Sequence, residues 1–171
     1  FDLVINTARG GVVNEQALLA AHAEGRVKDM IIDVWDGEPG FNDELARKAF
    51  IKTPHIAGYS VQAKLNASRI IANKLSEHFG LAPVNHNSTS LAKKPIDIPD
   101  SASSISDVIT SLHPILDYQE ELTRLIGIES TQKGIRFNKI RAEFPLRNEY
   151  STMDIPAPLF DRFPLLKTLF Q

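Results

Sequence analysis

Short apolar runs alternate with helical segments through residues 1–60 of this 171-residue chain. The runs at Leu3–Asn6, residues 29–35 and residues 50–53 predict three strands, because each is rich in β-branched or aromatic residues. Asn14 and Asn42 have good N-capping side chains and predict that a helix begins after each of them. Strands separated by helices of this length favour an α/β fold with a parallel, doubly wound sheet.

Polar side chains follow each of the three predicted strands. Arg9 comes after the first strand, Glu38 after the second and His55 after the third. In a parallel sheet the carboxyl ends of the strands lie at one edge, and ligands bind there. We therefore expect these three residues to share the functional edge of the sheet.

The rest of the chain divides by composition into three further parts. Residues 61–80 predict one long helix that crosses between domains, and residues 81–104 are rich in Pro, Asn, Ser and Lys, as is typical of a linker. Residues 105–171 predict a small α+β domain, with helical stripes that end near Gly127 and Pro145. Because so small a core is marginal by itself, we expect this domain to pack on a second copy, giving a homodimer.

Composition excludes several classes of function. Hydrophobic residues make up 43% and charged residues 23%, and the formal net charge of −2 gives no reason to expect a nucleic-acid or membrane partner. No apolar stretch approaches the roughly 20 residues that span a bilayer. With no cysteine and no positively charged leader, we expect a cytoplasmic protein, and we interpret Phe1 as a position inside a larger protein.

Arg9, Glu38 and His55 have the chemistry needed to oxidise a 2-hydroxy acid. A guanidinium binds a carboxylate through two parallel hydrogen bonds, and an imidazole takes up a hydroxyl proton near neutral pH. A carboxylate behind the imidazole fixes its tautomer. Each residue also has an ordinary structural interpretation: a surface ion pair for Arg9, a turn for Glu38, and a cap or core position for His55. We assign no residue as a metal ligand.

Three ordered motifs resemble the D-isomer-specific 2-hydroxyacid dehydrogenases. They are NTARGGVVNEQAL at residues 6–18, DVWDGEP at residues 33–39 and TPHIAG at residues 53–58. The resemblance implies a Rossmann-like NAD-binding domain, of which residues 1–60 are the C-terminal half. It implies that the catalytic residues are Arg9, Glu38 and His55, and that Thr7, Ala8, Arg9, Asp33 and Gly58 bind NAD.

Two shorter segments resemble the branch of this family that oxidises 4-phosphoerythronate in pyridoxal phosphate synthesis. They are WDGEPGFN at residues 35–42 and HIAGYS at residues 55–60, followed by Lys64. This resemblance implies a phosphorylated 2-hydroxy acid as substrate, contacted by Arg9 and Tyr59, although Tyr59 could equally be an aromatic that packs against the following helix. Residues 137–141 and 147–150 resemble the dimerisation domain of that branch.

Two alternative functions remain open at this point. One is a D-2-hydroxyacid dehydrogenase for glycerate, phosphoglycerate or lactate, and the other is a non-catalytic relative that senses NAD. The glycine-rich pyrophosphate motif of the family is expected upstream of Phe1, so we expect the chain by itself to bind NAD weakly and to be inactive.

Overall fold

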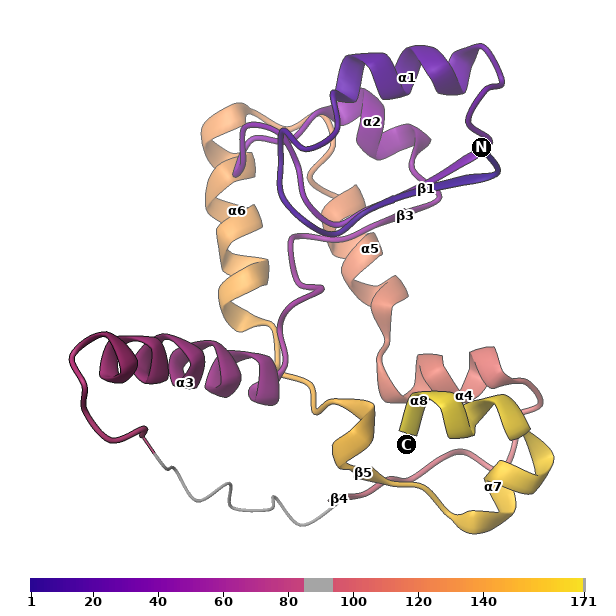
Figure 1. Cartoon of the computed structure of the whole chain (residues 1–171). Coiled ribbons are helices and arrows are strands. Elements are labelled where there is room, and N and C mark those ends of the chain that lie inside the picture. Colours follow the sequence, from indigo (N-terminus) through magenta and orange to yellow (C-terminus); the bar gives the residue numbers. More distant parts are fainter. Residues whose placement is uncertain (85–93, 171) are drawn as a thin grey trace. The chain divides into compact units, whose positions relative to one another are not determined.

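The structure, a computed structural model, describes residues 1–84 and 94–170, which form two compact units. The first unit comprises Phe1–Gly58 and Pro114–Pro145, and the second comprises Tyr59–His113 and Leu146–Gln171. Figure 1 shows the elements of each unit in the colours of the sequence.

A three-stranded parallel sheet forms the centre of the first unit. Its strands are β1 (Leu3–Asn6), β2 (Asp29–Ile32) and β3 (Ile51–Lys52), in the order β1-β2-β3. Met30 and Ile32 on the middle strand are fully buried, as expected for a strand of a parallel sheet. The predicted α/β fold with a Rossmann-like parallel sheet is confirmed.

Two helices connect these strands, and both begin at the predicted caps. The side chain of Asn14 accepts a hydrogen bond from the Ala17 amide at 2.9 Å at the start of α1 (Glu15–Ala23). Asn42 accepts from the Glu44 and Leu45 amides at the start of α2 (Asp43–Lys48). These bonds satisfy amides that have no partner inside the helix.

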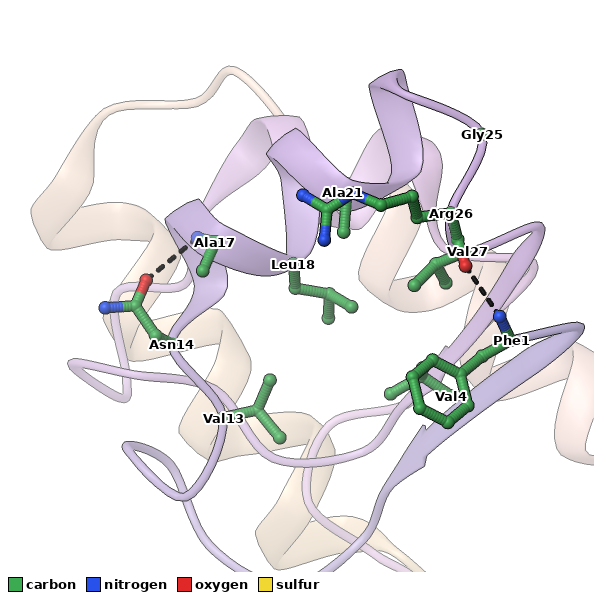
Figure 2. A pocket seen from close by; sticks show the side chains of 10 residues that line it. All are labelled: Phe1, Val4, Val13, Asn14, Ala17, Leu18, Ala21, Gly25, Arg26 and Val27. Carbon is green, nitrogen blue, oxygen red and sulfur yellow. Dashed lines mark hydrogen bonds between the residues drawn. The ribbon is translucent and has the colours of Figure 1, made fainter.

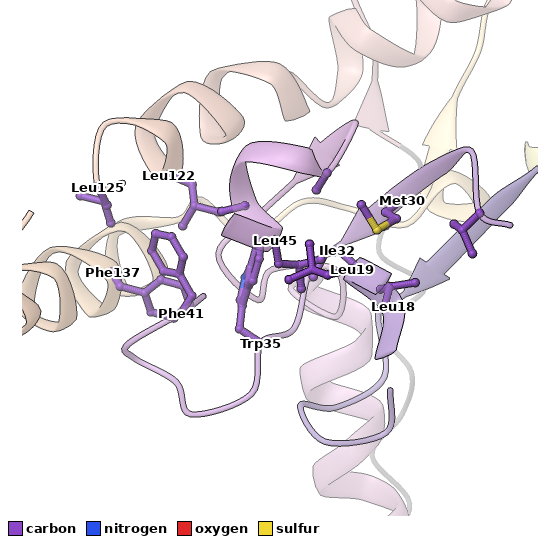
Figure 3. Packing of buried hydrophobic residues seen from close by; sticks show 13 residues of the cluster. Leu18, Leu19, Met30, Ile32, Trp35, Phe41, Leu45, Leu122, Leu125 and Phe137 are labelled. Carbon is purple, nitrogen blue, oxygen red and sulfur yellow. The ribbon is translucent and has the colours of Figure 1, made fainter. Parts of the chain in front are cut away.

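Two later helices complete the core of the first unit. They are α5 (Ile115–Thr123) and α6 (Ser130–Glu143). Leu122 of α5, Phe137 of α6 and Leu125 from the turn between them join the same cluster as the buried residues of β2 and α2. Figure 3 shows Phe137 beside Phe41, whose ring in turn lies 5.3 Å from Trp35.

This arrangement divides the chain differently from the domain boundaries expected from the sequence. Residues 114–145 pack with residues 1–58 because their apolar stripes cover the hydrophobic surface of the sheet layer. The rest of the expected 105–171 domain belongs to the second unit. A dimerisation role for the C-terminal residues stays a prediction.

The second unit has its own core, drawn from separate parts of the chain. Ala102, Val108, Met153, Leu166 and Phe170 form its centre. Its helices and strands are α3 (Val61–His78), β4 (Lys94–Pro95), α4 (Ile105–Leu112), η1 (Tyr150–Thr152), β5 (Met153–Asp154), α7 (Ala157–Arg162), η2 (Pro164–Leu166) and α8 (Lys167–Phe170).

Part of the predicted linker at residues 81–104 belongs to this second unit. β4 pairs in parallel with β5, and Ala102 is buried in the core, so the later part of that range is ordered structure. Residues 85–93 lie outside the described residues.

The long helix predicted at residues 61–80 is present as α3, but its apolar stripe is exposed. Leu65, Leu75 and Phe79 each keep more than half of their surface accessible. Among the helices that the structure describes, α3 included, none combines the length and the apolar character needed to cross a membrane.

Candidate active site

His55 and Glu38 form a pair at the carboxyl edge of the sheet. Nδ1 of His55 lies 2.8 Å from Oε2 of Glu38, and both side chains are about four-fifths buried, with 24% and 19% of their surfaces exposed. The other carboxylate oxygen of Glu38 accepts a hydrogen bond from the Trp35 amide at 2.9 Å. With Glu38 at Nδ1, the neutral imidazole carries its proton on that nitrogen, which leaves Nε2 free to accept one.

The backbone at His55 has an unusual conformation that Asp33 stabilises. His55 has a φ of 57°, in the left-handed region, which costs a non-glycine residue roughly 1–2 kcal/mol. The carbonyl of Asp33 accepts a hydrogen bond from the His55 amide at 2.7 Å. The Asp33 carboxylate, 2% exposed, accepts from the Ile56 amide, the Ala57 amide and the Thr53 hydroxyl.

These bonds give Asp33 a role that the sequence did not reveal. The family resemblance implied that Asp33 binds NAD, and that role stays a prediction. The structure adds that Asp33 holds the loop in which His55 is placed. A buried aspartate at the end of a central strand, followed about twenty residues later by Pro-His, is the signal that could have indicated it.

Arg9 lies on the loop after β1, at the same edge of the sheet. Its side chain is exposed, and Nη1 donates to the Ala8 carbonyl at 2.7 Å. The next residue, Gly10, packs tightly against the end of β2: a Cβ there would lie 2.2 Å from the Trp35 carbonyl oxygen. The loop of Arg9 is thereby fixed beside the backbone from which Glu38 is presented, while the guanidinium remains accessible.

The loop after β2 is also attached to the start of α1. The Asp36 amide donates to Oε1 of Glu15 at 2.8 Å. Burial raises the pKa of Glu15, and the hydrogen bond from Asp36 opposes that shift. Glu15, in the first turn of α1, therefore anchors the segment that leads to Glu38.

The predicted NAD-binding residues follow all three strands of the sheet, with Asp33 buried directly after β2. Thr7 and Ala8 are exposed after β1, and Gly58 is exposed after β3, where a Cβ would meet no atom within 4 Å. Exposed backbone at the carboxyl ends of parallel strands fits a dinucleotide. The residues present are therefore compatible with NAD at this edge of the sheet.

Tyr59 belongs to the second unit, where Nζ of Lys64 lies 4.6 Å from the centre of its ring. This contact fits an aromatic side chain that packs against α3. The substrate contact expected for Tyr59 stays a prediction.

A separate hollow of about 690 Å³ lies between α1 and β1 in the first unit (Figure 2). Its lining is mostly apolar, and Asn14, one of its polar residues, already caps α1. Arg9, Glu38 and His55 do not line it. Its lining includes the guanidinium of Arg26 but no imidazole or carboxylate side chain that could serve as the acid/base of hydride transfer from a hydroxy acid.

Comparison with known proteins confirms the resemblance predicted from the three motifs. Residues 2–57 match the family described as the D-isomer specific 2-hydroxyacid dehydrogenase, NAD binding domain. The matched residues contain β1, β2, β3 and the Glu38–His55 pair.

Curated relatives extend the similarity over most of the chain. The erythronate-4-phosphate dehydrogenase of Bacteroides thetaiotaomicron is 34% identical over 154 residues, and that of Proteus mirabilis is 30% identical over 158 residues. The corresponding protein of Marinobacter nauticus is 29% identical over 160 residues. Each alignment covers 90% of this chain but 41% of the relative, so the chain spans about two-fifths of the length of these proteins.

Proposed function

We propose that the protein containing this chain is an NAD-dependent dehydrogenase that oxidises 4-phospho-D-erythronate to its 2-oxo acid, a step in pyridoxal 5'-phosphate synthesis. The observation that carries this proposal is the 2.8 Å contact between Nδ1 of His55 and Glu38 at the strand ends. The contact lies within the residues that match an NAD-binding dehydrogenase domain. The similarity to erythronate-4-phosphate dehydrogenases supports the choice of substrate.

Each residue of the site has a defined task in this reaction. Arg9, exposed beside the site, binds the substrate carboxylate through its planar guanidinium. As the C2–H bond breaks and the C2–O bond becomes a carbonyl, the hydroxyl proton passes to Nε2 of His55. Glu38 stabilises the imidazolium that results. NAD⁺, when bound, supplies the acceptor for the C2 hydrogen and its electron pair.

The direct test is turnover by the full-length protein with NAD⁺, followed by NADH fluorescence. The substrates are 4-phospho-D-erythronate, D-glycerate, 3-phospho-D-glycerate and D-lactate at equal concentrations. We expect kcat/KM for 4-phospho-D-erythronate to exceed the others by at least about a hundredfold, because a site that pairs its polar groups with a substrate discriminates strongly against acids that leave them unpaired. A preference for another of these acids would contradict the proposed substrate and leave the reaction class intact.

Replacement of the proposed acid/base separates an enzyme from a non-catalytic NAD-binding protein. His55→Ala should lower kcat by roughly 10²–10⁴-fold and leave NADH affinity within about twofold. His22→Ala, at a partly buried position on α1, is the matched control and should retain activity. If the protein binds NADH but oxidises none of the four acids, the enzymatic proposal is wrong.

A further inference from the structure

α6 packs directly on the turn that carries Glu38. A Cβ on Gly134 would lie 3.2 Å from Cγ of Pro39, so the helix and the turn approach closely. One residue earlier, Nζ of Lys133 pairs with Asp43 at 2.5 Å and lies 4.8 Å from the centre of the Phe41 ring. The helix thereby contacts both ends of the loop between Glu38 and α2.

Arg141 on the same helix places its guanidinium near the carboxylate of Glu38. Arg141 lies about two helical turns beyond Gly134, and its Nη1 is 3.9 Å from Oε2 of Glu38. Its side chain is 25% exposed, and its Cζ lies 5.8 Å from the centre of the Phe137 ring. The oxygen that Arg141 approaches is the oxygen that faces Nδ1 of His55.

We propose that Arg141 is a positioning residue that orients the Glu38 carboxylate toward His55 during substrate oxidation. This inference rests on the proposed function. A largely buried carboxylate that faces both an imidazole and a guanidinium is restrained from two sides, so its rotation away from His55 is disfavoured.

The other charged groups of this region are engaged or exposed. Lys133 is paired with Asp43, and Asp36 is exposed on the turn before Glu38. Glu15 is bound to the Asp36 amide, and the guanidinium of Arg9 donates to the Ala8 carbonyl. Within the residues that the structure describes, Arg141 is the cation paired with Glu38 besides His55.

The test compares Arg141→Gln with Arg141→Lys in the full-length protein. Arg136→Gln is the matched control, because Arg136 is exposed on the same helix and its loss removes the same charge from α6. The first readout is kcat and KM for substrate oxidation, determined separately at neutral pH. The second is the rate at which diethyl pyrocarbonate acylates His55, followed by mass spectrometry of its peptide, which measures the reactivity of the imidazole without turnover.

We expect Arg141→Gln to lower kcat about tenfold at neutral pH, because Glu38 is then held from one side only. KM should change less than about twofold, since Arg9, the proposed carboxylate ligand, stays in place. Acylation of His55 should slow severalfold, because Glu38 no longer holds the imidazole with its proton on Nδ1 and Nε2 as the nucleophile. Arg141→Lys should restore most of kcat, and Arg136→Gln should match the wild type.

An unchanged kcat and an unchanged acylation rate in Arg141→Gln would overturn the inference, as would equal losses in Arg136→Gln. The acylation readout keeps the two proposals distinguishable. If the wild type oxidises none of the acids, the proposed function fails, and the acylation rate of His55 still shows whether Arg141 acts on the pair.

Discussion

Asp33 holds the backbone of His55 from the end of the neighbouring strand, with the His55 amide donating to the Asp33 carbonyl at 2.7 Å. The carboxylate of Asp33 binds the two amides that follow His55. The left-handed conformation of His55 thus depends on a buried acid twenty-two residues earlier. These hydrogen bonds hold His55, the proposed acid/base, in a backbone conformation that is otherwise unfavourable.

Asp33→Asn should weaken both folding and catalysis. An amide can accept from only one of the two loop amides, since its NH₂ group faces the other as a donor. We expect a loss of about 1–3 kcal/mol in the free energy of unfolding, measured by urea denaturation, and a fall in kcat larger than the change in KM. Asp29→Asn, exposed on the same strand, is the control. Wild-type stability in Asp33→Asn would contradict this account of the loop.

Glu38→Gln should reduce kcat about a hundredfold, because the amide no longer stabilises the imidazolium or fixes its tautomer. NADH affinity should stay within about twofold, since Glu38 faces His55 and the Trp35 amide. Steady-state kinetics and NADH fluorescence titration measure the two effects. Glu44→Gln on α2, exposed, is the matched control. Full activity in Glu38→Gln would remove Glu38 from the mechanism.

Phe137→Ala should destabilise the first unit by about 3–5 kcal/mol, the range for truncation of a fully buried aromatic. Its ring lies 6.0 Å from that of Phe41, so the loss should affect the sheet layer as well as α6. Urea unfolding followed by fluorescence of Trp35, the one tryptophan of this chain, reports on that layer. Ile135→Ala, 58% exposed on the same helix, should change stability by less than about 0.5 kcal/mol. Equal effects of the two substitutions would mean that α6 does not share the core.

His113 should make the second unit less stable in mild acid. Burial, with the nearby charge of Arg147, lowers the pKa of His113, and its ring lies 5.1 Å from that of Tyr150. Below about pH 6.5 His113 is protonated in the unfolded chain but stays neutral in the folded unit. The free energy of unfolding therefore decreases as the pH falls toward the lowered pKa of His113.

Thermal unfolding of the wild type and of His113→Gln between pH 8 and pH 5 measures this dependence. At pH 8 the imidazole is neutral in both states, so the comparison there gives the cost of the substitution alone. The wild type should lose more stability on acidification than the variant. Parallel pH curves for the two proteins would contradict the assigned burial of His113.

The first fifty-eight residues show how much local sequence determines. The caps at Asn14 and Asn42, the β1 strand and the parallel sheet follow from short-range patterns and were predicted, whereas the strand order comes from the structure. The meeting of Glu38 and His55 was predicted as well, because consecutive strand ends of a parallel sheet share one edge. The lengths of β2 and β3 were overestimated, since apolar character continues past the last paired residue.

The position of residues 114–145 was decided by tertiary packing. Leu122 and Phe137 lie on apolar helix faces that the spacing in the sequence predicts. That spacing does not show which part of the chain each face packs against. The same holds for α3. Its apolar stripe was predicted, but the stripe is exposed in the described structure, and the sequence did not indicate this.

Sequence alone therefore determined the elements of the first sheet, their parallel arrangement and which polar residues follow the strand ends, because caps and hydrophobic periodicity act over short separations. Only the tertiary structure decided that Asp33 supports His55 and that Arg141, 103 positions beyond Glu38, reaches its carboxylate. Such contacts depend on how helices pack in three dimensions, and no local pattern in the chain encodes a partner so distant.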